Sequence, residues 1–75
     1  MNPAEAARVE TFKNLSAAVA GLVKRAGFRS HTLTVLTDNG QAHTAVDMQD
    51  DVDALIMIEN GRKTTLDLID QRKST

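Results

Sequence analysis

The chain has 75 residues and no cysteine, which leaves room for one domain and excludes disulfides and thiolate metal sites. Apolar residues make up 41% but only two are aromatic, so small aliphatic side chains must build the core, and no run approaches the roughly 18 apolar residues of a membrane span. The formal net charge is −1, without the strong basic surplus typical of nucleic-acid-binding proteins.

The first predicted element is a helix over about residues 3–26. Asn2 is a favoured N-cap, Pro3 suits the first helical position, and Glu5 lies where it can reach back to the cap. Apolar residues then recur at helical spacing: Phe12, Leu15, Val19, Leu22, Val23 and Ala26. Gly27 is placed to take the left-handed conformation that ends a helix, so both ends are marked.

The next segment predicts a β-hairpin with Asn39-Gly40 as its loop. Asn-Gly is the strongest two-residue hairpin signal, because a type I′ turn needs positive φ at both central residues. In that register Leu33 pairs with Val46. One face then collects Leu33, Val35, Val46 and Met48, and the other shows Thr32, Thr34, His43 and Asp47.

The pattern repeats 21 residues later at Asn60-Gly61, which predicts a second hairpin. The predicted fold class is then α+β: a long N-terminal helix followed by two antiparallel hairpins that form a four-stranded sheet (αββββ). The alternative is αββαβ, with a short helix at about 51–60 that is capped by Asp50 and ended by Gly61. Residues 1–75 make one domain in either case, and we expect the tail 71–75 to fray.

An acidic stretch lies between the two Asn-Gly sites. Residues 30–61 carry six acidic side chains and no Lys or Arg, while both flanks are basic. Four of the aspartates cluster: Asp47, Asp50, Asp51 and Asp53. They fit an acidic patch for a basic partner, a Ca²⁺ or Mg²⁺ site, or a solvated turn, but their spacing matches no twelve-residue calcium loop. We therefore predict no metal site and assign the cluster as the candidate partner-binding patch. His31 and His43 fall on opposite faces of the predicted hairpin, so they cannot share a metal ion within one chain.

Uncovered apolar surface is a further feature of the predicted sheet. One helix about 10 Å wide cannot cover both faces of four strands spaced about 4.8 Å apart. The side chains left without cover are Leu36, Ile56, Ile58 and Ile69. A second copy of the chain is the simplest cover, so we predict a homodimer with this face at its interface.

The sequence holds no organised catalytic set and no glycine-rich phosphate loop, so we predict a non-enzymatic protein without a cofactor. The leading hypothesis is a small cytoplasmic protein-interaction module, an adaptor or an inhibitor of phage or mobile-element type, for example an anti-defence protein in the host cytoplasm. It would dock its acidic patch on the basic surface of a larger protein. The alternatives are a structural or assembly subunit, such as a virion component, and a nucleic-acid-binding protein that uses the basic face of the first helix. We expect no membrane partner, and direct nucleic-acid binding is the less favoured alternative.

Overall fold

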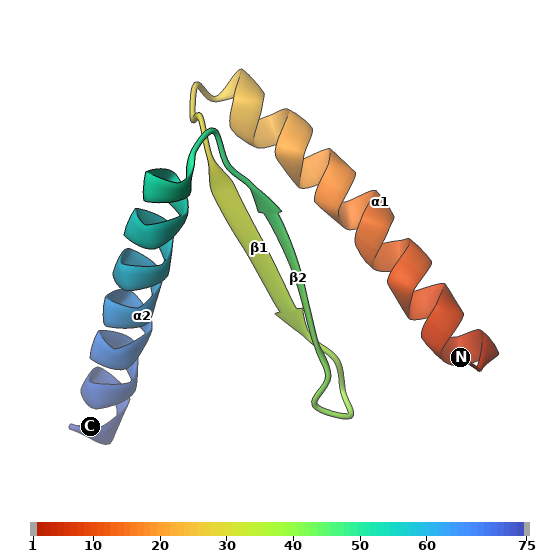
Figure 1. The fold of residues 1–75 in the computed structure, drawn as a ribbon. Helices are drawn as coiled ribbons and strands as arrows, with labels where there is room; N and C mark the ends of the chain where they lie inside the picture. Colours follow the sequence, from red (N-terminus) through yellow and green to blue (C-terminus); the bar gives the residue numbers. More distant parts are fainter. Residues whose placement is uncertain (1, 75) are drawn as a thin grey trace.

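The computed structural model describes residues 2–74. Its elements are α1 (Pro3–Arg25), β1 (His31–Leu36), β2 (Ala42–Asp47) and α2 (Asp51–Lys73). Figure 1 shows three arms, α1, the hairpin and α2, which diverge from one end of the molecule with the hairpin between the two helices. We call that end the junction; it contains the two connecting segments, residues 26–30 and 48–50.

Both ends of α1 form as the sequence predicts. The Asn2 side chain accepts a hydrogen bond of 2.9 Å from the backbone N–H of Glu5, which satisfies one of the free donors of the first turn. At the other end Gly27 has a φ of +93°, and the N–H of Phe28 donates to the carbonyl of Val23 at 3.2 Å. This is the Schellman arrangement, and it ends the helix through the backbone. The Phe28 side chain stays 66% exposed.

The hairpin lies where it is predicted, but its predicted register is wrong by one residue. Leu33 pairs with Ala45 rather than with Val46 in the antiparallel ladder of β1 and β2. Because side chains alternate between faces along a strand, the shift moves Val46 to the face opposite Leu33. Val46 is accordingly 52% exposed, whereas Leu33 and Ala45 are half-buried.

The turn explains the shift in register. The loop holds three residues, 38–40, between Thr37 and Gln41, which are joined by a backbone hydrogen bond of 2.8 Å. The N–H of Gly40 donates to the carbonyl of Thr37 at 3.0 Å, and Gly40 has a φ of +86°. Asn39 does not have the positive φ that a type I′ turn requires of it. The loop is instead a type I turn followed by a left-handed glycine, which adds one residue to the connection.

α1 packs on one face of the hairpin. The ring of Phe12 stacks on the imidazole of His43, with centroids 5.6 Å apart and planes at 30°. Near the junction, the Lys24 ammonium lies 4.0 Å from the Asp47 carboxylate, an exposed pair worth at most about 1 kcal/mol. An apolar hollow of about 290 Å³ remains between α1 and the hairpin, so packing is incomplete even here.

The second half of the chain is a single helix, so the predicted four-stranded sheet is wrong, and so is the last strand of the αββαβ alternative. That alternative did place the helix start: Asp50 is the N-cap, and its carboxylate accepts a hydrogen bond of 2.9 Å from the Asp53 N–H. The helix continues through Asn60-Gly61 instead of ending there.

The pattern of apolar residues favours helix over strand in this half, and the N-cap offsets the main local cost of forming the helix. Residues 54–58 are apolar at every position, so they lack the alternation of a half-buried strand. The N-cap at Asp50 contributes about 1 kcal/mol, which offsets the similar cost of Gly61 inside a helix. The helix includes residues 71–73, residue 75 lies outside the described residues, and fraying of the tail stays a prediction.

The described chain is open and has no core of its own. No apolar side chain among residues 2–74 is buried. The Cα radius of gyration is 14.8 Å, against about 11 Å for a compact domain of this length. The accessible surface of 6088 Å² exceeds by roughly 1,600 Å² the value of about 4,500 Å² expected for a compact protein of 8.1 kDa.

Candidate functional site

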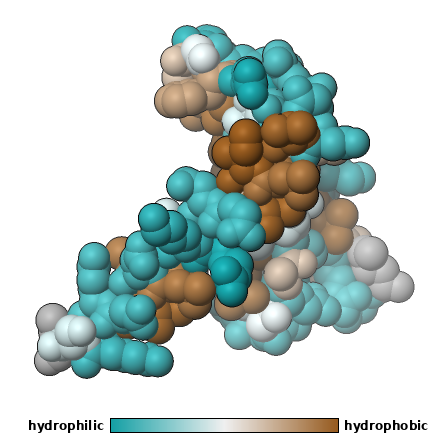
Figure 2. Space-filling model, turned by 60° about the vertical axis from the view of Figure 1, so that its left-hand side comes forward, coloured by the Kyte–Doolittle hydropathy of each residue, from teal (hydrophilic) through white to brown (hydrophobic). Residues whose placement is uncertain are grey.

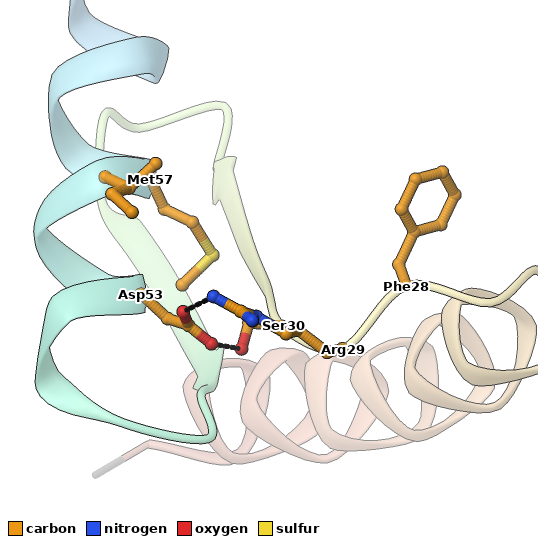
Figure 3. Close-up of a pocket in the computed structure, with 6 residues that line it drawn as sticks. Phe28, Arg29, Ser30, Asp53 and Met57 are labelled. Carbon is orange, nitrogen blue, oxygen red and sulfur yellow. Dashed lines mark hydrogen bonds and ion pairs between the residues drawn. The ribbon is translucent and has the colours of Figure 1, made fainter.

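The junction is organised around the carboxylate of Asp53, in the first turn of α2. The Arg29 guanidinium donates to one carboxylate oxygen and the Ser30 hydroxyl to the other, each at 2.5 Å. The Ser30 hydroxyl also accepts a hydrogen bond of 3.1 Å from the backbone N–H of Gln49. Figure 3 shows the carboxylate facing both donors, which come from the segment between α1 and β1. The Asp53 carboxylate and the Ser30 hydroxyl together tie both connecting segments to the start of α2.

This environment keeps Asp53 ionised. The hydrogen bond from Ser30 lowers the pKa of Asp53 from its ordinary value of 3.8, and Arg29 lowers it further through its hydrogen bond and its charge. Burial of the carboxylate, which is 3% exposed, acts in the opposite direction. A carboxyl group that transfers protons near neutral pH needs a raised pKa. The cluster is therefore suited to holding α2 at the junction and unsuited to acid–base chemistry.

A shallow hollow of about 200 Å³ opens beside this cluster. It is lined by Phe28, Arg29, Ser30, Asp53, Ile56 and Met57. Figure 3 shows the Met57 side chain directed toward the ion pair and the Phe28 ring directed away from it. Because Phe28 and Ile56 are both exposed, the hollow is an apolar surface without cover beside a satisfied ion pair.

α2 is covered by the rest of the chain only at its start. Asp53 is buried and Met57 is half-buried, whereas every residue from 58 to 74 is exposed. The large apolar side chains that α2 exposes are Val52, Leu55, Ile56, Ile58, Leu66, Leu68 and Ile69. Figure 2, turned to bring α2 forward, shows a broad apolar patch in the middle of the molecular surface in this view and further apolar atoms along the α2 arm. Neither helix of the described range is both long enough and apolar enough to cross a bilayer.

The four aspartates of the predicted acidic patch lie in different settings. Asp53 is buried in the ion pair, and Asp50 caps α2 with its carboxylate. Asp47 lies beside Lys24, and Asp51 is exposed at the first residue of α2. Three of the four carboxylates thus have partners inside the chain. Docking of this patch on a basic protein stays a prediction.

The structure does not bring the predicted dimer face together. Leu36 lies at the end of β1, and Ile56, Ile58 and Ile69 lie on α2. Since each helical residue turns by about 100°, Ile58 and Ile69 share a side of α2 and Ile56 lies on another side. All four side chains are exposed, as the prediction requires, but they do not form one surface.

The two histidines share a face of the hairpin, contrary to the prediction. His31 pairs with Asp47 and His43 pairs with Val35, so the shift in register brings both imidazoles to the side of α1. They lie at opposite ends of the ladder, about 13 Å apart at 3.3 Å per residue. Among residues 2–74, no group of three or more His, Asp or Glu side chains is placed to hold a metal ion.

Comparison of the chain with protein-family models, with curated proteins and with solved structures finds no match.

Sequence reasoning missed the partners of Asp53. Arg29 and Ser30 precede it by more than twenty residues, and no local pattern marks such a long-range pair. It also missed the stack of Phe12 on His43, which depends on the actual register. The signal available for α2 was the helical spacing of its apolar residues behind the Asp50 cap.

Proposed function

We propose that this chain is a non-enzymatic protein-interaction module whose hydrophobic core is completed by association. The observation that carries the proposal is the lack of any buried apolar side chain among residues 2–74, together with thirteen large apolar side chains that are exposed. Soluble monomers rarely expose contiguous apolar patches of more than a few hundred Å². Helices in water also gain most of their stability from packing, and α2 has almost none within its own chain.

The size of the uncovered surface supports the same proposal. The chain exposes roughly 1,600 Å² beyond the expectation for a compact protein of its mass. A standard interface covers about 800 Å² on each partner, and obligate complexes cover more. The excess is therefore large enough to be the surface that an obligate partner covers.

Among the hypotheses from the sequence, this surface favours an assembly subunit over a docked acidic patch. Apolar side chains are exposed on both α2 and the hairpin, whereas most carboxylates of the patch already have partners. The roles of adaptor, phage-type inhibitor or virion component, and a cytoplasmic location, are predictions from the sequence alone.

Thermal unfolding followed by circular dichroism at several protein concentrations tests the proposal. If association completes the core, the midpoint should rise by about 5–10 °C over a hundredfold increase in concentration, because mass action stabilises the associated state. A cooperative transition with one midpoint at every concentration would show that the isolated chain folds by itself, and it would refute the proposal.

A further inference from the structure

One side of α2 carries an apolar stripe that no other element of the described chain covers. Leu55, Ile58, Leu66 and Ile69 are 65%, 61%, 45% and 41% exposed. At about 100° per residue they fall within one narrow sector of the helix. That sector points opposite Asp53, the residue that ties α2 to the junction. The stripe therefore faces away from the rest of its own chain.

The order of residues along this stripe is symmetric about Arg62. Leu55 and Ile69 each lie seven residues from Arg62. Ile58 and Leu66 each lie four residues from it. Two copies of α2 that cross antiparallel with Arg62 at the two-fold axis would place each of these aliphatic side chains opposite an aliphatic side chain of the partner copy. A two-fold interface requires this kind of self-complementary surface.

The charges at the ends of the stripe follow the same symmetry. Asp51 and Lys73 lie in the same sector, each eleven residues from Arg62. Antiparallel pairing brings Asp51 of each copy opposite Lys73 of the other, so opposite charges meet at both ends. Parallel pairing would place like charges together at both ends. The charge pattern thus selects a second copy in the antiparallel direction.

Arg62 would meet its own counterpart at the axis. Glu59 lies one turn earlier on a neighbouring position, so it can offer each Arg62 an opposite charge across the interface. The long aliphatic stem of an arginine can also lie along apolar surface while its guanidinium stays in water.

We propose that α2 is a homodimerisation helix that pairs antiparallel with α2 of a second copy through Leu55, Ile58, Leu66 and Ile69, with Arg62 at the two-fold axis. This inference rests on the proposed function and names its partner and its surface. It leaves the open face of the hairpin available for further association.

Single-cysteine variants test the geometry, because the chain has no cysteine of its own. A disulfide requires Cα atoms within about 7 Å of each other. Arg62→Cys should therefore form a disulfide-linked dimer under mild oxidation. The control Thr64→Cys lies on the other side of α2 and is also exposed. Arg62→Cys should oxidise about 100-fold faster than this control, because a thiol within a dimer has a millimolar effective concentration.

A second pair of variants tests whether the two α2 helices run antiparallel. Leu55→Cys alone should not cross-link, because the two Leu55 positions of an antiparallel pair lie about 21 Å apart along the axis at 1.5 Å per residue. A mixture of Leu55→Cys and Ile69→Cys chains should cross-link to each other. Self-linking of Leu55→Cys would indicate parallel helices and overturn the proposal.

The remaining outcomes separate this inference from the function on which it rests. If light scattering shows a dimer but Arg62→Cys and Thr64→Cys oxidise at the same slow rate, another surface forms the interface; the α2 pairing is then refuted and the proposed function stands. If the chain is a folded monomer at about 100 μM, its fold does not need a second copy, whereas obligate homodimers often have no stable folded monomer; both the pairing and the proposed function are then refuted.

Discussion

The two helices of this chain have the same length, 23 residues each, and opposite surroundings. α1 packs on the hairpin through the stack of Phe12 on His43. α2 is held at its first turn by the Asp53 cluster, and all its residues beyond Met57 are exposed. Both helices have a side-chain N-cap, so local signals do not account for the difference.

The contrast shows that helix-forming signals and a place to pack are separate requirements. Capping residues and helix formers decide that residues 51–73 are helical. They do not bury Ile58 or Leu66, because α2 diverges from the hairpin after its first turns and does not pack on the face that α1 leaves open. α1 and the hairpin therefore form the part that is partly packed internally, and α2 is the part that association must cover.

The largest expected effect comes from a charge in the middle of the α2 stripe. Ile58→Asp should weaken self-association by more than about 100-fold, since each of two copies loses about 1.5–3 kcal/mol of apolar burial. Sedimentation equilibrium measures the change in the dissociation constant. Thr64→Asp is the matched control, because it places the same residue on the other side of α2 and should leave the dissociation constant nearly unchanged. Equal weakening by both variants would contradict a role for the stripe.

A smaller effect is expected in the internally packed half. Phe12→Ala removes the ring that stacks on His43 and should lower the free energy of unfolding by about 2 kcal/mol, less than for a fully buried phenylalanine. Urea unfolding gives this value. Lys13→Ala, at the exposed neighbouring position, should change it by no more than about 0.5 kcal/mol. A neutral Phe12→Ala would mean that α1 does not pack on the hairpin as described.

Replacing glycine by alanine should change the free energy of unfolding in opposite directions in the two halves of the chain. Gly61 is helical, and an added Cβ would meet nothing within 4 Å, so Gly61→Ala should stabilise α2 by about 1 kcal/mol. Gly40 has a φ of +86°, so Gly40→Ala should destabilise the hairpin by about 1–2 kcal/mol. Urea unfolding of both variants gives the signs. A destabilising Gly61→Ala would place a turn at that residue, as the hairpin prediction did.

The smallest expected effect on stability appears only at acidic pH. Because the folded pKa of Asp53 is lowered, its contribution to stability is complete above the ordinary value of 3.8 and is lost as the pH falls below it through the folded pKa. Urea unfolding across this range should show the loss. Asp53→Asn should remove this component of the pH dependence, and Asp51→Asn should keep it, because that change leaves the Asp53 carboxylate in place. An unchanged pH profile in Asp53→Asn would show that the junction does not depend on this charge.

The sequence predicts structure correctly where neighbouring residues alone determine the backbone conformation. Asn2 and Gly27 mark both ends of α1, and the structure confirms both. The hairpin was located but not its register, because Asn39-Gly40 fits two loop lengths and only Gly40 takes the left-handed conformation. The second hairpin that Asn60-Gly61 predicts is wrong, because this dipeptide lies within α2. The partners of Asp53 depend on the tertiary structure and left no local pattern.

The mass of the chain in solution shows whether its core is completed by association. Sedimentation equilibrium of the unmodified chain over a hundredfold range of concentration, with helix content measured on the same samples, gives both quantities needed. If the α2 helices pair, the mass should be twice 8.1 kDa where the helix signal is full, and helix content should fall as the dimer dissociates on dilution. A mass of 8.1 kDa at every concentration with full helix content would contradict completion of the core by association.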